Sequence, residues 1–206
     1  MSNNIPFNPA QVLYPSAPPE LQPHLQAMVH DRLIKHGIAA FAAPRRSAIA
    51  HETSHAIVGQ HEGFKISRVT IHRHTVPPFG ECWGGWCSED SGRWTVGPDT
   101  DPGNDLRRSR FLFAGLAGES VTGQDLPGSS LDELLLSQGC AAKAAAKLGV
   151  DAQTLWHEQI ERAVIAIIRA NRKPFEQLVA LLDRKEKVQG SKLRSVLAQV
   201  IRVPDR

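Results

Sequence analysis

Two histidines and a glutamate in the segment His51-Glu52-Thr53-Ser54-His55 have the types and the spacing of a zinc hydrolase site. On an α-helix, residues four positions apart lie on one face about one turn apart, so both imidazoles can reach one metal ion. Glu52 directly follows His51, and its carboxylate can lie beside the metal without binding it, where it takes a proton from metal-bound water. Chance would produce this spacing only about 0.02 times in such a chain. The alternative is a buried structural histidine pair.

The flanking residues predict the helix that this spacing requires, over roughly residues 45–61. Pro44 suits a first helical position, where a missing N–H costs nothing. Small and apolar residues surround the motif, and Gly59 and Gly63 are stop signals. A strand is predicted at residues 65–72, because apolar and polar residues alternate there, and a second near 83–87. Further helices are predicted at residues 19–36, 105–122, 130–147, 151–171, 174–186 and 192–201.

These elements predict a mainly α fold of the α+β class, a helical bundle that carries the HExxH helix next to a small β-hairpin or sheet. A chain of 206 residues forms one domain, or one domain with an appendage. Residues 1–23 hold six of the fourteen prolines and are expected to be an extended or disordered arm. We therefore divide the chain into an arm plus N-terminal helix, residues 1–43, and a main domain, residues 44–206.

Composition limits the kinds of partner and the cellular compartment that we expect. The net charge of +3 is small, and the densest basic patch, Arg107, Arg108 and Arg110, has no interleaved aromatics, so it predicts a solvated helix face and no nucleic-acid site. We expect no membrane anchor and no secretory signal, since the sequence has no apolar run of spanning length and no basic-then-apolar start. Three cysteines, an odd number, fit a reducing cytoplasm better than a disulfide framework.

A catalytic zinc needs a third protein ligand, and residue types alone leave it open. The histidine candidates are His61, His72, His74 and His157, and the carboxylates are more numerous. His61 has the spacing of the third histidine of the metzincin pattern HExxHxxGxxH, but Val58 stands where that pattern needs glycine.

Segments in order along the chain resemble the FtsH-type zinc metallopeptidases. Residues 48–58 resemble the active-site helix of that family, and residues 69–73 the strand that follows it. Phe113–Gly123 resembles its small-residue helix, GGRAAExxxxG, and Gly128-Ser129-Ser130-Leu131-Asp132 resembles its GASND segment. Residues 170–190 resemble its C-terminal helical pair.

This resemblance implies a zinc metallopeptidase domain over residues 44–206, with His51, His55 and Asp132 as Zn²⁺ ligands, Glu52 as general base and no other cofactor. Glu119 matches the glutamate of the small-residue helix. Two interpretations of it stay open, an acceptor for N–H groups in a helix bundle and a hydrogen-bond partner of a ligating histidine. The chain departs from the family at Leu131, where the family has asparagine, in a longer segment at Thr75–Gly103, and in having no GxxxxGK[ST] phosphate loop.

The expected activity is hydrolysis of peptide bonds in flexible or unfolded polypeptides, and the expected location is the cytoplasm. The resemblance suggests two kinds of partner, a separate ATPase and further copies of the chain in a ring. The strand residues Val69, Thr70, Ile71 and His72 are expected to pair with the extended substrate. The alternative is a catalytically silent, metal-stabilised adaptor or regulatory protein. Cys82 and Cys87 could bind a second metal or be plain loop thiols. Trp83 and Trp86 could line a substrate groove or cap the core. His72 and His74 lie on the same face of the predicted strand.

Overall fold

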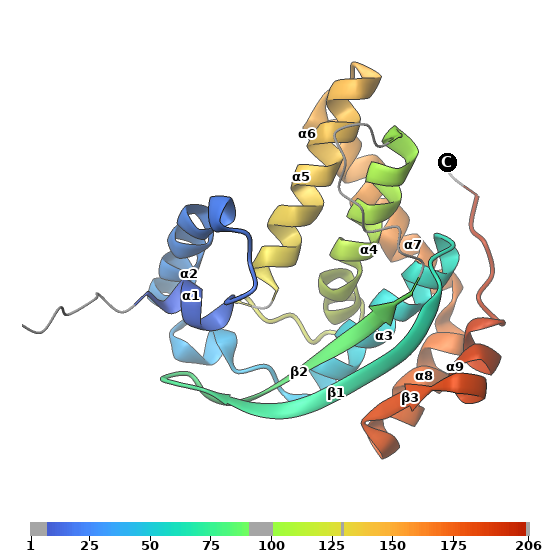
Figure 1. Ribbon diagram of the computed structural model, residues 1–206, viewed down its shortest axis with the longest axis horizontal. Coiled ribbons are helices and arrows are strands. Elements are labelled where there is room, and N and C mark those ends of the chain that lie inside the picture. Colours follow the sequence, from blue (N-terminus) through green and yellow to red (C-terminus); the bar gives the residue numbers. More distant parts are fainter. Residues whose placement is uncertain (1–7, 91–100, 129, 205–206) are drawn as a thin grey trace, which may run out of the picture.

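The computed structural model describes residues 8–90, 101–128 and 130–204, and shows helices gathered around one central helix, with a curved antiparallel sheet laid along it (Figure 1). The predicted mainly α, α+β class is confirmed. In chain order the elements are α1 (Pro9–Leu13), η1 (Pro19–Leu21), α2 (Gln22–His36), η2 (Ile38–Phe41), α3 (Arg45–His61), β1 (Ile66–Val76), β2 (Gly80–Glu89), α4 (Pro102–Val121), α5 (Leu131–Leu148), α6 (Ala152–Leu155), the π-helical turn η3 (Trp156–Glu161), α7 (Arg162–Ala170), α8 (Arg172–Lys185), β3 (Lys187–Gln189) and α9 (Gly190–Leu197).

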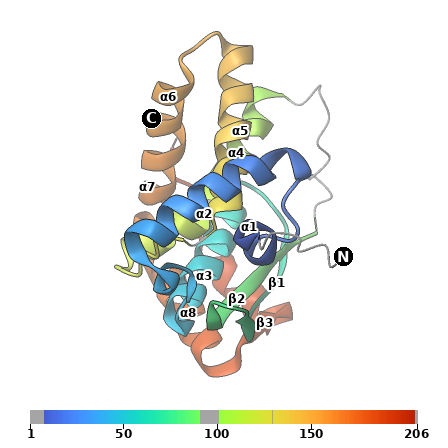
Figure 2. The same cartoon turned by 90° about the vertical axis from the view of Figure 1, so that its left-hand side faces the viewer.

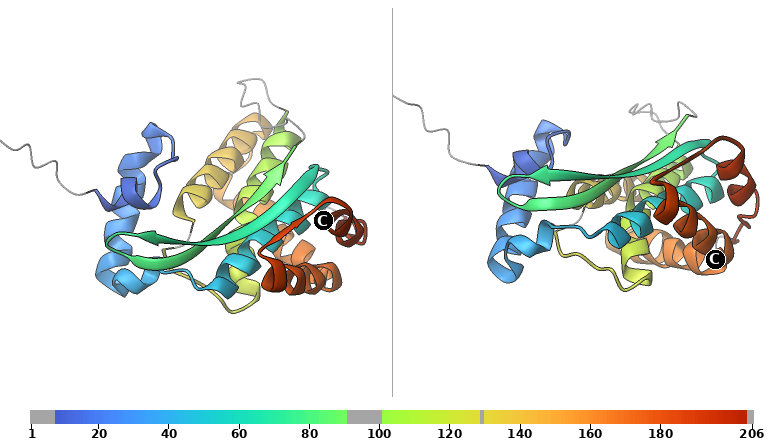
Figure 3. Two further views of the ribbon diagram at one scale, coloured as in Figure 1. Left: turned by 60° about the horizontal axis from the view of Figure 1, so that its bottom comes forward. Right: turned by 90° about the horizontal axis from the view of Figure 1, so that it is seen from below.

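The central helix is α3, which carries the HExxH motif and has the predicted bounds. Every residue from Ser47 to Gly59 is buried, because α3 contacts the sheet on one side and α4, α7 and α8 on others (Figures 1 and 3). A helix enclosed on all sides cannot show the polar face of a surface helix. Small and apolar residues therefore surround the motif, and its polar side chains must find partners inside the protein.

The sheet has the order β2-β1-β3, with both neighbours antiparallel to β1. Val69 and Ile71 of β1 point into the core that also contains Ile57 and Val58 of α3. The predicted hairpin is present and is longer than expected, whereas the three-residue strand β3 was not predicted. Since β1 is the central strand, β2 is an edge strand of the sheet.

The strand residues Val69, Thr70, Ile71 and His72, expected to pair with an extended substrate, lie in a strand whose backbone is largely paired within the protein. Val69 and Thr70 pair with β2 on one side and with β3 on the other, and the N–H of Ile71 donates to Glu186 O at 2.8 Å. His72 pairs with Gly84 of β2 and lies just beyond the short strand β3. An incoming peptide would have to displace β3 to reach this part of β1.

The small residues of α4 allow this helix to approach α3 closely. A Cβ atom added at Gly118 would collide with the side chain of Ser54, and one added at Gly115 would collide with the ring of His51. The next helix, α5, packs along α4, where the hydroxyl of Ser109 bonds to Ser137. These contacts bring both helices against the HExxH motif.

The N-terminal segment is folded from residue 8 onward, so the expectation of an extended or disordered arm is wrong for residues 8–23. Pro9 and Pro19 occupy first positions of short helices, where proline is well tolerated. A second apolar cluster joins this segment to the rest of the protein, with Ala10, Tyr14, Ala17, Leu25, Val29, Ala40, Phe41, Phe79 and Leu131 as its buried members. Figure 2 shows α1 and α2 on one side of the molecule, beside the start of α5.

Two expectations from composition can be compared with the structure. Among the residues described, no helix combines the length and the apolarity that a membrane span needs. The basic patch is not a uniformly solvated face, because Arg110 is buried and bonds to Glu62 and to the backbone oxygen of Gln159.

Candidate metal centre

Three side chains converge between α3 and the start of α5. Nε2 of His51 lies 3.0 Å from Nε2 of His55, and Oε2 of Glu133 lies 3.1 Å from the first and 3.4 Å from the second. The two histidines are buried and the carboxylate is about one-quarter exposed. His51, His55 and Glu133 thus form a group that could hold a metal ion.

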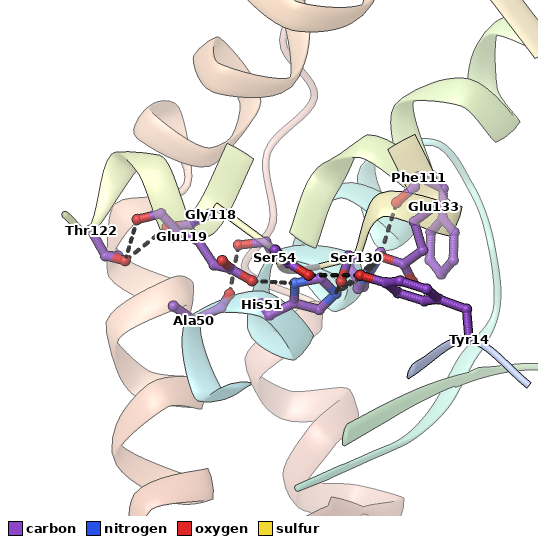
Figure 4. A network of polar contacts seen from close by, with 12 residues as sticks. Tyr14, Ala50, His51, Ser54, Phe111, Gly118, Glu119, Thr122, Ser130 and Glu133 are labelled. Atoms are coloured by element: carbon purple, nitrogen blue, oxygen red, sulfur yellow. Dashed lines mark hydrogen bonds and ion pairs between the residues drawn. The ribbon is translucent and has the colours of Figure 1, made fainter. Parts of the chain in front are cut away.

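The hydrogen bonds on the far side of each imidazole determine which nitrogen faces the centre. Nδ1 of His51 lies 2.7 Å from Oε1 of Glu119, and Nδ1 of His55 lies 2.8 Å from the carbonyl oxygen of Phe111 (Figure 4). Carboxylate and carbonyl oxygens accept hydrogen bonds, so each Nδ1 carries a proton and each Nε2 of a neutral ring presents a lone pair. Two lone pairs and a carboxylate oxygen therefore face one another, an arrangement that needs a cation or a proton between them.

The spacing of the three atoms fits a zinc ion. Zinc binds imidazole nitrogen and carboxylate oxygen at about 2.0–2.2 Å, and tetrahedral geometry then puts two ligand atoms about 3.3 Å apart. The three observed separations are 3.0, 3.1 and 3.4 Å. The contact of Glu119 with His51 agrees with one of its two predicted roles, since it makes Glu119 a direct partner of a candidate ligand. Such carboxylate–histidine pairs orient ligating imidazoles in metal sites.

The electrostatics of the cluster favour a bound positive charge. Burial alone would lower the pKa of His51, but Glu133 and Glu119 raise it well above its ordinary value. Burial would raise the pKa of Glu133, but His55 and His51 hold it far below its ordinary value. A proton on His51 can therefore occupy the centre of the group in place of a metal ion, and metal binding would release it.

Glu52 lies beside the cluster without belonging to it. Its carboxyl is buried against Gly85 of β2, where an added Cβ would collide with the Glu52 side chain. Burial raises the pKa of Glu52 to about 7, with Glu133 and Glu119 adding to the effect and His51 and His55 opposing it. A carboxyl group with a pKa near neutral pH is suited to accept and return a proton.

The structure differs from the sequence prediction at the third carboxylate. Asp132, the predicted ligand, is half-buried at the second position of α5 and is not a member of the cluster, and the adjacent Glu133 takes its place. Consecutive helical residues point about 100° apart, so only one of the two can face the histidine pair. Burial, followed by the charge of Glu133, raises the pKa of Asp132 to about 6.

Ser130 directly precedes α5 and lies close to the cluster. Ser130 has a left-handed backbone conformation with φ of 45°, which is uncommon for a residue other than glycine. Its hydroxyl lies 3.4 Å from Nε2 of His51. Sequence reasoning had no signal for this conformation, and a shift of one residue in the first turn of α5 exchanges the two carboxylates.

The remaining predicted candidates lie outside the cluster. Cys82 contacts Nε2 of His74 at 3.3 Å, whereas Cys87 packs against the core. The two cysteines are five positions apart on one strand and so point to opposite faces, which argues against one metal bound by both. Trp83 is half-buried under the guanidinium of Arg45, and the side chain of Trp86 is largely exposed.

His61 and His157, the other histidine candidates, bond elsewhere. Nε2 of His61 accepts the N–H of Val203 at 2.9 Å, and His157 pairs with Glu161 on the surface of η3.

Comparison with known proteins finds no family model that matches this chain and no curated protein with significant similarity to it.

Proposed function

We propose that this chain is a zinc-dependent endopeptidase. The observation that carries the proposal is the convergence of three acceptor atoms, from His51, His55 and Glu133, next to the buried carboxyl of Glu52. A purely structural zinc has no need of an additional acid beside it, whereas hydrolysis needs a group that moves a proton. The resemblance of residues 44–200 to FtsH-type metallopeptidases supports the same reaction.

Each residue of the site would have a separate role in the reaction. His51, His55 and Glu133 would hold the ion, and Glu119 and the Phe111 carbonyl keep both imidazoles turned toward it. When bound, zinc supplies Lewis acidity, which polarises a carbonyl and makes water more acidic. Glu52 takes the proton of the attacking water and later delivers it to the leaving amine, a cycle that a pKa near 7 favours.

The edge strand β2 is the candidate binding surface for the substrate backbone. The N–H of Trp83 points away from β1, since it donates to Ala43 O at 2.8 Å. Alternate residues of a strand direct their N–H groups to the same side, so Gly85 and Cys87 also direct theirs away from β1. Gly85 is in contact range of Glu52, so a peptide paired along this edge would pass next to the proposed base.

This arrangement favours flexible or unfolded polypeptides as substrates, because only an extended segment can add to a strand edge. Backbone pairing supplies affinity without requiring one sequence. The separate ATPase and the ring of copies suggested by the resemblance stay predictions, as does the cytoplasmic location.

The test compares zinc-loaded wild type with the Glu52→Gln variant on an unfolded, fluorescently labelled polypeptide. The amide cannot act as a base but keeps the size of the side chain, so we expect retained zinc and a rate lower by two orders of magnitude or more. Equal rates in the two proteins would eliminate the peptidase. Tight zinc binding in a wild type without turnover would support the metal-stabilised adaptor instead.

A further inference from the structure

The only tyrosine of the chain, Tyr14, lies at the loop that leads into the candidate metal centre. It belongs to the N-terminal segment and follows α1. Its ring is buried, and its hydroxyl donates to the carbonyl oxygen of Gly128 at 2.6 Å. The backbone of Leu131 interacts with the same hydroxyl. One phenol group thus contacts Gly128 and Leu131, on the two sides of the turn that precedes Glu133. Figure 4 draws Tyr14 together with Ser130 and Glu133.

The N-terminal segment holds this turn at two further points. The N–H of Gly128 donates to Ala40 O at 3.0 Å, and an added Cβ at Gly128 would meet the ring of Phe41 at 2.5 Å. Leu131, the first residue of α5, is buried in the same apolar cluster as Tyr14 and Phe41. The turn is therefore enclosed by residues that lie 88 positions (Ala40) to 114 positions (Tyr14) before Gly128 in the sequence.

The turn needs such support, because its conformation is not one that the local sequence favours. Ser130 is in the left-handed region, where side chains with a Cβ are disfavoured, and neighbouring contacts must maintain it. Relaxation of Ser130 would rotate the first turn of α5. Asp132 and Glu133 point about 100° apart, so such a rotation would turn Glu133 away from His51 and His55.

We propose that the N-terminal segment, residues 8–41, is an integral support of the metal centre and that Tyr14 is its positioning residue. The Tyr14 hydroxyl fixes the turn at Gly128 and Leu131, and the turn fixes the direction of Glu133. This inference depends on the proposed metal site. It adds a residue, Tyr14, that determines the zinc affinity by holding Glu133 in position. The segment is thus a part of the centre and not an appendage to it.

The experiment measures zinc affinity by competition with a chromogenic chelator for wild type and for Tyr14→Phe in the full chain. The substitution keeps the ring in the apolar cluster and removes only the hydroxyl. Loss of a hydrogen-bond partner of a metal ligand lowers affinity by about 10–100-fold. Tyr14 acts on Glu133 through the turn and does not bond to it, so we expect the zinc Kd to rise by about 10-fold, the lower end of that range. The control is Asn171→Ala, which removes a buried side chain bonded to Ile167 O and to the N–H of Ile201. This control should lower Tm at least as much and leave the zinc Kd unchanged.

A second measurement needs no variant. Wild type labelled with 3-fluorotyrosine has one ¹⁹F resonance, because the chain has one tyrosine. Zinc should shift this resonance, because the metal centre and the Tyr14 hydroxyl are connected through the turn before Glu133. An unshifted resonance, or an equal zinc Kd in Tyr14→Phe and wild type, overturns this inference and leaves the metal site standing. A wild type that binds no zinc refutes the metal site and the inference together.

Discussion

The identity of the third metal ligand can be decided by a matched pair of variants, Glu133→Gln and Asp132→Asn. Each replaces a carboxylate by the amide of the same size, at neighbouring positions of one helix turn. Oε2 of Glu133 lies 3.1 Å from His51 Nε2 and 3.4 Å from His55 Nε2, so its charge would act directly on the ion. Two unit charges about 4 Å apart interact by about 4 kcal/mol at an effective dielectric constant near 20. We therefore expect Glu133→Gln to raise the zinc Kd by about 1,000-fold or more.

Asp132→Asn should change the zinc Kd by less than about 10-fold, because its carboxyl is not a member of the group formed by His51, His55 and Glu133. Competition titrations with chelators of graded affinity, followed by metal analysis after gel filtration, measure both values. The unfolding temperature of each metal-free variant shows that both are folded. A larger loss of zinc affinity in Asp132→Asn than in Glu133→Gln would show that Asp132, and not Glu133, faces the two histidines. The assignment of Asp132 as a ligand from the family resemblance would then be correct.

Two further predictions concern the surroundings of the cluster. Gly115→Ala places a methyl group on the ring of His51, so it should weaken zinc binding and lower Tm. The control is Gly139→Ala on α5, where an added methyl group meets nothing within 4 Å. It should leave zinc binding unchanged and stabilise the helix by up to about 1 kcal/mol. The raised pKa of Glu52, about 7 against an ordinary 4.5, contributes stability that is present below pH 4.5 and is lost as pH rises toward 7. This difference corresponds to about 3 kcal/mol, so chelator-treated Glu52→Gln should be more stable than wild type at pH 8 by up to that amount. Urea unfolding at pH 5 to 8 measures it, and parallel pH curves for the two proteins would contradict the burial of this carboxyl.

The sequence was sufficient for the helix that carries the motif and for the small residues that let another helix approach it. Pro44 and the glycines after His55 marked the ends of α3, and the glycines of α4 are of the type that lets another helix pack closely. These features are local, since each depends on residues within one or two helical turns. The contact between Glu119 and His51 was one of two stated alternatives for the same reason, since residue type limited what Glu119 could do.

The sequence was not sufficient where distant segments decide the local conformation. The choice between Asp132 and Glu133 depends on Ser130, whose left-handed backbone is held by residues of the N-terminal segment. The first part of that segment, up to residue 23, was expected to be extended or disordered because it is rich in proline. From residue 8 onward its apolar side chains, Tyr14 among them, belong to a buried cluster. The position of β1 in the sheet likewise depended on β3, a strand of three residues with no distinct sequence pattern.

The order of the cluster residues along the chain has a consequence during synthesis. Both imidazoles leave the ribosome early, but the carboxylate that completes the group follows 78 residues after His55. A nascent chain therefore cannot assemble the group of His51, His55 and Glu133 until Glu133 has been synthesised. Under the proposed function, a newly made molecule would stay inactive until the segments before Glu133 had been made and could fold.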